Sequence, residues 1–273
     1  MKIALIGDIV GKLGRWAVSQ ILPELKKTEE IDFVIANVEN AAGGFGLTKE
    51  IAQKIFSYGV DCLTSGNHIW DRKEIFPYLD AEKRLLRPAN YPYTVPGFGS
   101  GVYFVNEKQK VGVLNIQGRV FIKEIDDPFK VAEKEAEILK RETNIIVIDF
   151  HAEATSEKQA FAWYLDGTVS AILGTHTHVQ TADETILPEG TAYITDVGMT
   201  GPHLSVIGIR KEDAIARFIS QIPNRFTLGT EDIKFSAVVV EIDDQSGKAK
   251  SIKRLKIDLK KNDKTGNWEK ELL

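Results

Sequence analysis

One stretch brings the predicted fold and the predicted chemistry together: Val169-Ser170-Ala171-Ile172-Leu173-Gly174-Thr175-His176-Thr177-His178. Its apolar first half, with β-branched residues, predicts a buried β-strand that ends at Gly174. If the chain stays extended beyond Thr175, the imidazoles of His176 and His178 lie on one face. Two imidazoles at the end of a strand are typical of half a metal site. The alternative interpretation is a pair of exposed loop histidines.

The composition indicates a globular protein with a sizeable core. The chain has 273 residues, of which 43% are hydrophobic and 27% are charged, and this suits one large α/β domain, with or without a small appendage. The formal net charge of −4 argues against a surface for duplex nucleic acid. It does not argue against a small phosphate ligand, since bound metal ions can supply positive charge.

The cysteine count and the apolar runs bear on the compartment. Cys62 is the one cysteine, so no intramolecular disulfide can form, and its apolar neighbours predict a buried side chain. The run Ile3–Ile6 is too short for a signal peptide, and Asp8 interrupts it. Because no apolar stretch approaches the roughly 18 residues of a membrane span, we expect a cytoplasmic protein that does not contact membranes.

The first third of the chain predicts a βαβαβ unit. Its strands are expected at residues 2–7, 32–37 and 60–65, and its helices at residues 15–27 and 48–58. Such a unit forms a parallel sheet with helices on its faces, and ligands bind beyond the carboxyl ends of the strands. Polar side chains follow all three strands at these ends: Asp8, Glu39, Asn40, Asn67 and His68.

The middle of the chain is less regular. Prolines and glycines over residues 85–101 predict an irregular connection, and a hairpin is expected from residues 102–105 and 110–116. Residues 117–128 match no long element. They predict either a small lid near the site or an ordinary surface connection.

The second half alternates helices with strands and closes with a hairpin. Strands are expected at residues 144–150, 184–187 and 192–195, helices at 129–141, 156–163 and 212–221, a loop at 196–203, and a hairpin from 234–242 and 248–258. His151 stands at the carboxyl end of the first of these strands. We expect one domain over residues 1–258 and a polar C-terminal tail over residues 259–273. If the domain has a small cap or lid, we expect it to come from about residues 85–128.

Histidines gather at the predicted strand ends. Four of the five do so, and with the polar residues of the βαβαβ unit they make one candidate set: Asp8, Glu39, Asn40, Asn67, His68, His151, His176 and His178. The number of donors suits two cations, and the mixture of carboxylate, amide and imidazole suits iron, manganese or zinc better than magnesium or calcium. Two ions about 3.5–4 Å apart can hold the attacking and leaving oxygens of a displacement at phosphorus, and they make a bridging hydroxide available near neutral pH.

These motifs resemble those of the calcineurin-like metallophosphoesterases. That family carries Asp-x-His, Gly-Asp-x-x-Asp, Gly-Asn-His-Asp/Glu, a lone His and Gly-His-x-His, each at a strand end. The matching stretches here are Gly7-Asp8, Glu39-Asn40, Gly66-Asn67-His68, His151 and Gly174-Thr175-His176-Thr177-His178. Three positions depart from the general pattern: Val10 replaces the first histidine, Glu39 replaces the bridging aspartate, and Ile69 follows Gly-Asn-His.

The YmdB-like phosphodiesterases, a subgroup of that family, share these departures. Longer stretches are also similar to the subgroup, namely Gly7–Gly11, Asn37–Gly44, Asp149–Lys158, Gly174–Asp183 and Asp196–Pro202. The resemblance implies a four-layer α/β/β/α sandwich with a mixed sheet core. It also implies two metal ions per chain, often iron, with manganese or zinc as alternatives, and hydrolysis of cyclic nucleotides, chiefly 2′,3′-cyclic mononucleotides to 3′-phosphates.

The resemblance further implies a role for each motif residue. Asp8, Asn40 and His178 would hold the first metal, and Asn67, His151 and His176 would hold the second. Glu39 would bridge the two ions, and His68 would be the general acid that protonates the leaving 2′-oxygen. The first metal would have few protein ligands, because Val10 stands where the family has a histidine.

Some nearby residues keep two interpretations, and the motifs identify no residue that binds the substrate. Asn40 could cap a turn; Gly43, Gly44 and Gly46 would cradle phosphate or form a plain turn; Phe45, Trp70 and Met199 would stack on a base or pack in the core; and His203 would line the substrate pocket or lie apart from it.

The expected partner is a small cyclic nucleotide, and a homo-oligomer is a further expectation. Two rival functions are a broader phosphoesterase and a metal-binding regulatory protein that signals without turnover. His68 argues against the regulatory protein, because a pure binder needs no general acid. An RNA-binding module fits poorly with the acidic composition.

Overall fold

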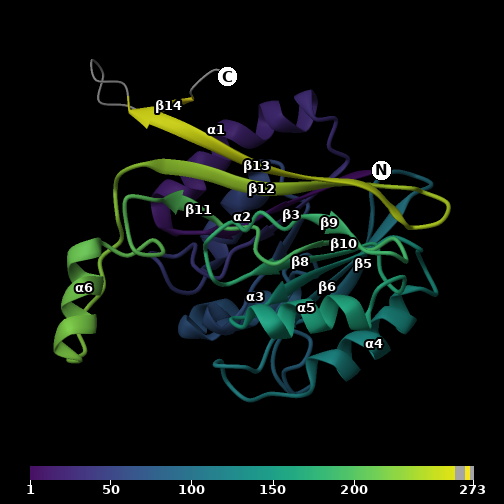
Figure 1. Cartoon of the computed structure of the whole chain (residues 1–273), viewed down its shortest axis with the longest axis horizontal. Helices are drawn as coiled ribbons and strands as arrows, with labels where there is room; N and C mark the ends of the chain where they lie inside the picture. The colour runs from purple at the N-terminus through teal and green to yellow at the C-terminus, as the bar shows by residue number, and fades with distance from the viewer. Residues whose placement is uncertain (262–267, 271–273) are drawn as a thin grey trace.

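The computed structural model describes residues 1–261 and 268–270 (Figure 1). Its helices are α1 (Gly11–Thr28), α2 (Lys49–Ser57), α3 (Phe76–Ala81), α4 (Pro128–Leu139), α5 (Thr155–Tyr164) and α6 (Lys211–Ser220), with short 3-10 turns η1 (Asn67–Asp71) and η2 (Lys73–Ile75). Its strands are β1 (Lys2–Ile6), β2 (Asp8–Ile9), β3 (Phe33–Asn37), β4 (Cys62–Thr64), β5 (Ser100–Phe104), β6 (Lys110–Gln117), β7 (Ile146–His151), β8 (Ala171–Thr175), β9 (Thr185–Ile186), β10 (Ala192–Ile194), β11 (Met199–Pro202), β12 (Ile233–Ile242), β13 (Ala249–Lys261) and β14 (Trp268–Lys270).

These strands form two mixed sheets. The first sheet has the order β14-β13-β12-β1-β3-β4, with β11 paired to β12 and β2 paired to β11. Its β1, β3 and β4 run parallel, as the βαβαβ pattern predicts, whereas β12 runs antiparallel to β1. The second sheet has the order β5-β6-β7-β8-β10-β9, with parallel central strands and antiparallel strands at its two edges.

The alternation of side chains along the strands sets the layers. In β1, Ile3 and Leu5 pack in a core between the two sheets, while Ala4 and Ile6 pack in the core that includes α1. A third core joins the other face of the second sheet to α4 and α5. Figure 1 shows α1 above the sheets and α4 and α5 below them. The predicted four-layer α/β/β/α sandwich is confirmed.

Two local predictions in the first sheet are wrong. Helix α1 begins at Gly11 rather than near residue 15, because glycine lets its first turns lie against β11: a Cβ on Gly14 would stand closer than 3.0 Å to the Thr200 carbonyl oxygen. Residues 199–202 form β11 rather than a loop, since Thr200 pairs with Ile9 of β2. A four-residue strand that contains Gly-Pro carries little strand signal of its own.

Two segments bear on the predicted domain limits. Within residues 85–128, β5 and β6 are strands of the second sheet, and residues 118–127 form a loop. At the C-terminus, β13 continues to Lys261 and pairs with β14, so strand structure extends into the predicted tail. The rest of that tail, residues 262–267 and 271–273, lies outside the described residues.

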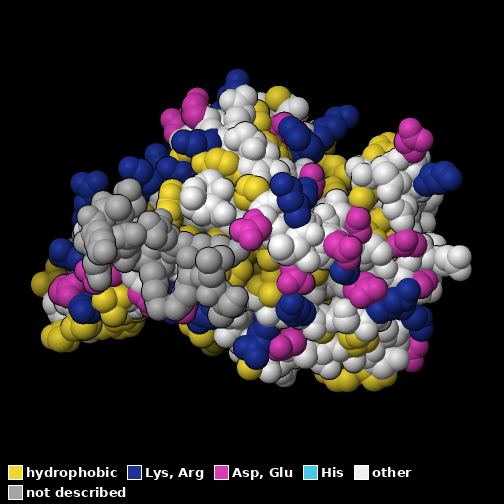
Figure 2. All heavy atoms as spheres, turned by 90° about the horizontal axis from the view of Figure 1, so that it is seen from above, with side chains coloured by type: hydrophobic (Ala, Val, Ile, Leu, Met, Phe, Trp, Pro, Cys, Tyr) yellow, Lys and Arg dark blue, Asp and Glu magenta, His cyan; other side chains and the backbone are white. Residues whose placement is uncertain are grey.

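The surface is of mixed character. On the face shown in Figure 2, positive and negative side chains are intermixed, and hydrophobic side chains gather at the end that carries α6. Three of the exposed apolar residues of this helix are Ile215, Phe218 and Ile219. None of the described helices combines the length and the apolar character that crossing a membrane would take.

Candidate metal centre

Residues from strand ends of both sheets meet at one edge of the sandwich. The first sheet contributes Asp8 in β2, Glu39 and Asn40 after β3, and Asn67 and His68 in η1 after β4. The second sheet contributes His151 at the end of β7, and His176 and His178 directly after β8. The contacts that follow join these residues across the two sheets.

Glu39, His151 and His176 form one ligand group, here named the His151 group. His151 Nε2 lies 3.1 Å from Glu39 Oε2 and 3.0 Å from His176 Nδ1. Asn67 Oδ1 lies 3.3 Å from the same nitrogen. Two ring nitrogens, a carboxylate and an amide oxygen therefore converge. This mixture of donors suits iron, manganese or zinc.

Asp8, Glu39 and His178 form a second ligand group, here named the His178 group. Asn40 Oδ1 lies 3.2 Å from His178 Nε2. Asp8 is fully buried, and although its Oδ2 accepts the backbone N–H of His176 at 3.1 Å, its Oδ1 has no hydrogen-bond partner within the described residues. A buried carboxylate oxygen is costly unless a donor or a cation binds it. Glu39 belongs to both groups.

A chain of buried hydrogen bonds fixes the ring of His151. The hydroxyl of Thr175 donates to Asp149 Oδ1 at 2.7 Å, and its oxygen lies 2.9 Å from His151 Nδ1. Because the hydroxyl proton is used, the oxygen accepts from Nδ1–H. Asp149 also accepts the Thr64 hydroxyl and, at 2.9 Å, the side-chain amide of Asn37. Nε2 of His151 is thereby left for the ligand group, as metal ligation requires.

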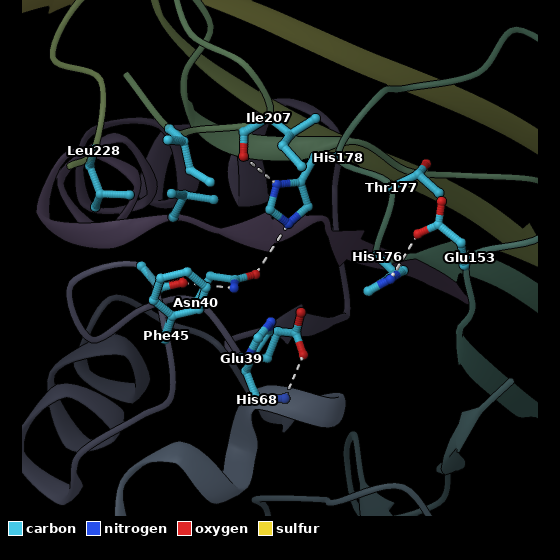
Figure 3. A pocket seen from close by; sticks show the side chains of 13 residues that line it. Glu39, Asn40, Phe45, His68, Glu153, His176, Thr177, His178, Ile207 and Leu228 are labelled. Atoms are coloured by element: carbon cyan, nitrogen blue, oxygen red, sulfur yellow. Dashed lines mark hydrogen bonds and ion pairs between the residues drawn. The ribbon is translucent and has the colours of Figure 1, made fainter. Parts of the chain in front are cut away.

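The other two rings are fixed in the same manner (Figure 3). His176 Nε2 lies 3.0 Å from Glu153 Oε2, which leaves Nδ1 for the His151 group. His178 Nδ1 donates to the carbonyl of Ile207 at 2.8 Å, which leaves Nε2 for the His178 group. Outer partners of this kind orient metal-binding imidazoles. Glu153 and Ile207 were not predicted, because such contacts join residues that are distant in sequence.

The chain does not stay extended beyond Thr175, so the condition for placing both imidazoles on one face is not met. His176 and His178 have positive φ values of 96° and 67°, which are uncommon for residues other than glycine. The turn sends one imidazole to each ligand group instead of both to one face. Asp196 stabilises it, because Oδ2 accepts the backbone N–H of Thr177 at 3.0 Å and the Thr177 hydroxyl at 2.8 Å.

The site shifts the protonation of its own residues. Burial alone would raise the pKa of Glu39, but the facing imidazole of His151 helps to hold it at about 2. Burial lowers the pKa of His151, yet Glu39 outweighs it and the value rises to about 9. Burial raises the pKa of Asp8 to about 6, and burial beside His151 lowers that of His176 to about 3. In the metal-free chain His151 is therefore protonated, and an entering cation must displace that proton.

Two hollows open beside the ligand groups. The smaller, of about 250 Å³, is bordered by Glu39, Asn40 and His178 and by the apolar residues Val10, Phe45, Ile207, Ile209 and Leu228 (Figure 3). The larger, of about 560 Å³, is lined by Asn67, His68, Trp70, Asp71, Tyr91, Phe121, Ile122, Lys123 and His176. His68 and His176 border both hollows.

His68 is held from two sides. Its backbone N–H donates to Glu39 Oε2 at 3.2 Å, and its Nδ1 lies 2.8 Å from Asp71 Oδ2. The ring remains partly exposed, and Phe45 stands edge-on to it with 4.9 Å between ring centroids. Nε2 is therefore the nitrogen left for a ligand. Asp71 was not predicted, since a charged residue in a short turn has no distinctive pattern.

The positions of Phe45, Trp70, Met199 and His203 separate the residues that border a hollow from those that do not. Phe45 and Trp70 border the hollows, whereas Met199 is buried in β11 and serves packing. His203 donates through Nδ1 to the carbonyl of Gly201 at 3.0 Å and borders neither of these two hollows.

The glycine-rich segment after Asn40 is a tight turn. Gly43, Gly44 and Gly46 have positive φ values, which glycine adopts without strain. The N–H of Gly44 donates to the Asn40 carbonyl at 3.2 Å, and the Asn40 side chain donates to the Gly44 carbonyl at 2.8 Å. The N–H of Gly44 is thus used within the turn. The amide nitrogen of Asn40 closes the turn, while its oxygen faces His178.

Known proteins resemble this chain over most of its length. The family model of YmdB-like proteins matches residues 4–255. Over 258 residues the chain is 51% identical to a 2′,3′-cyclic-nucleotide 2′-phosphodiesterase of Bacillus subtilis (strain 168), covering 94% of this chain and 97% of that protein. A solved structure of a hypothetical protein from Thermus thermophilus is 38% identical with a TM-score of 0.88, covering 94% of this chain and 99% of that one. A solved phosphatase from Mycoplasma pneumoniae is 36% identical with a TM-score of 0.89, covering 94% and 93%. The chain therefore belongs to the YmdB-like family.

Proposed function

We propose that this chain is a two-metal phosphodiesterase that hydrolyses 2′,3′-cyclic mononucleotides to 3′-phosphates. The observation that carries the proposal is Glu39, which belongs to two ligand groups at once while its carboxylate also contacts the backbone of His68. A carboxylate shared by two sets of nitrogen and oxygen donors fits a pair of ions bound close together. The activity named for the Bacillus subtilis relative supports the substrate class.

The donor sets fit metal ions. In each group the donor atoms lie within 4.8 Å of one another, and the buried Oδ1 of Asp8 accepts no hydrogen bond within the described residues. We assign Asp8, Asn40 and His178 to one ion, Asn67, His151 and His176 to the other, and Glu39 to both. The imidazole content favours iron, with manganese or zinc as alternatives. When bound, such ions would neutralise the phosphate and lower the pKa of a water held at the site.

His68 donates a proton to the leaving group. Asp71 fixes Nδ1, so Nε2 delivers a proton to the 2′-oxygen as the bond from phosphorus to that oxygen breaks. Overall, one water molecule is added across the broken bond. The oxygen of the water joins phosphorus, and one proton joins the 2′-oxygen. The product is a nucleoside 3′-phosphate. Proton transfer of this kind contributes typically about 10²- to 10⁴-fold in rate.

The test is hydrolysis of adenosine 2′,3′-cyclic phosphate by purified protein, with metal content measured on the same sample. We expect the 3′-phosphate as product and about two metal ions per chain, the number of ligand groups. His68→Ala should lose about 10²- to 10⁴-fold in kcat with its metals retained. His203→Ala is the matched control, because this histidine borders neither hollow, and it should keep the wild-type rate.

Three results would contradict the proposal in different ways. Equal rates on p-nitrophenyl phosphate and on the cyclic diester would favour a broader phosphoesterase. Two bound metals without turnover of either substrate would favour the regulatory protein. Full activity of His68→Ala would place the general acid elsewhere.

A further inference from the structure

Phe121 is exposed and strained at the same time. It lies in residues 118–123, here named the Phe121 loop. Its side chain is 89% exposed and its φ is 62°. A left-handed backbone is unfavourable for a bulky residue, and a ring in water gains no packing energy in return. Two unfavourable features in one residue indicate a role other than stabilising the fold.

The loop is held firmly at its base. Glu157 is only 8% exposed, and its carboxylate accepts the backbone N–H groups of Arg119 at 2.9 Å and Val120 at 3.2 Å. The N–H of Gly118 donates to the carbonyl of His151 at 2.9 Å. A Cβ on Gly118 would come closer than 3.0 Å to Glu157 Oε2, so glycine permits this close approach. The exposed ring therefore projects from a loop whose base is hydrogen-bonded to Glu157 and to His151 of the ligand group.

Phe121 lines the larger hollow, which has aromatic walls beside the general acid. Tyr91 is buried in this hollow, with its hydroxyl donating to Gln117 Oε1 at 3.2 Å. Trp70 packs edge-on against Tyr91 with 5.1 Å between ring centroids, and the ammonium of Lys123 lies 5.9 Å from the Tyr91 ring. Aromatic faces with a nearby cation suit a flat, π-bearing ligand.

The larger hollow suits a nucleoside better than the smaller one does. Its volume of about 560 Å³ falls within the roughly 300–1,000 Å³ of small-molecule sites, whereas about 250 Å³ falls below this range. Apart from polar residues at the metal centre and Gly44, the smaller hollow is lined by aliphatic residues and by Phe45, whose ring is turned edge-on to His68. In the larger hollow, by contrast, the Phe121 ring is almost wholly available for contact.

We infer that the larger hollow is the nucleobase subsite and that Phe121 is the residue on which the base stacks. The inference rests on the proposed function for the nature of the ligand, a nucleoside phosphate. The phosphate would lie at the ligand groups, the ribose beside His68, and the base against Phe121. A base in this position covers the exposed ring, which accounts for an aromatic side chain held in water on a loop that is hydrogen-bonded at its base.

The first test compares two substrates that differ only in the base: adenosine 2′,3′-cyclic phosphate and methyl riboside 2′,3′-cyclic phosphate. The ratio of their kcat/KM values measures what the base contributes. Phe121→Ala should lower this ratio by roughly 5- to 150-fold, the range for loss of one stacking contact. Phe121→Trp should keep it. Phe104→Ala is the control, because Phe104 is an exposed phenylalanine that lines neither hollow.

A second test measures binding without turnover. Isothermal titration with adenosine 3′-phosphate should give a Kd for Phe121→Ala that is roughly 5- to 150-fold weaker than that of the wild type. If Phe121→Ala binds adenosine 3′-phosphate more weakly than the wild type, but the wild type hydrolyses no cyclic nucleotide, the base subsite is supported and the proposed function fails.

Two outcomes would overturn the subsite. In the first, the wild type hydrolyses the cyclic nucleotide normally, and Phe121→Ala changes neither the substrate ratio nor the Kd. This result would leave the proposed function intact. The other is a ratio that falls in Phe45→Ala instead, which would place the base in the smaller hollow.

Discussion

Lys158 in α5 is a buried cation, and its replacement by methionine should destabilise the chain and loosen the metal centre. The side chain is fully buried, as is that of Asp196. Its ammonium donates to Asp196 Oδ2 at 2.8 Å and to the Thr175 carbonyl at 2.7 Å. Asp196 in turn accepts the N–H groups of Thr177 at 3.0 Å and Gly198 at 2.8 Å. Lys158→Met would leave this carboxylate buried without its counter-charge.

The magnitude follows from that burial. Removing one partner of a buried, hydrogen-bonded ion pair costs about 3–5 kcal/mol in the free energy of unfolding. For a chain of this size such a loss lowers Tm by roughly 6–20 °C. The second effect is on metal affinity, because Lys158 and Asp196 fix the turn that carries His176 and His178. Loss of outer support of this kind typically weakens metal binding by about 10- to 100-fold.

The assay is urea unfolding of the metal-free protein with excess chelator, followed by metal titration of the folded variant. Lys130→Met is the matched control, because Lys130 pairs with Glu133 on the exposed face of α4, and its loss should change stability by less than about 1 kcal/mol. Lys158→Met combined with Asp196→Asn should be more stable than Lys158→Met alone, since no unpaired charge remains. A loss below about 1 kcal/mol for Lys158→Met, with normal metal affinity, would refute this reasoning.

Three further predictions concern the same centre and its surroundings. Gly66→Ala should abolish metal binding, as measured by metal content, because a Cβ there would come closer than 3.0 Å to the His151 ring and to Glu39 Oε2; retained metals would contradict this. Asp8→Asn should make the metal-free chain more stable above pH 6, by up to about 3 kcal/mol, because burial raises the pKa of Asp8 from 3.8 to about 6 and the wild type loses stability as pH rises through that value. The difference in urea midpoint should shrink toward pH 4, and a pH-independent difference would rule out this cause. Cys62 should react with a thiol reagent only after unfolding, because it is fully buried and burial raises its pKa; rapid labelling of the native chain would show otherwise.

The sequence predicts which candidate residues the fold brings together where those residues follow strands. Asp8, Glu39, Asn67 and His151 each stand at the carboxyl end of an apolar run, and the geometry of parallel strands brings such ends together. The four layers and the pairing of ligands with each ion came from the resemblance to a family. Alternation of helices and strands alone predicts a parallel sheet and does not anticipate β12 beside β1.

Contacts between distant side chains could not be predicted. Lys158 has the pattern of a solvated helix residue, since nothing local shows that Asp196 will face it inside the protein. Glu153 likewise becomes an outer partner of His176 only when α5 and β8 are in place. The left-handed backbone at His176 and His178 departs from local preference, and such departures are typical of functional sites.

The turn from Thr175 to His178 has a consequence for how the centre fills. It supplies one ring to each ligand group, and Glu39 supplies a carboxylate oxygen to each. Because the two groups share Glu39 and one turn, the donor geometry of one group is tied to that of the other. In the proposed two-metal site, a substitution that displaces the turn or Glu39 should therefore weaken the binding of both ions together. By linkage, whatever effect one ion has on the affinity of the second, the second has equally on the first.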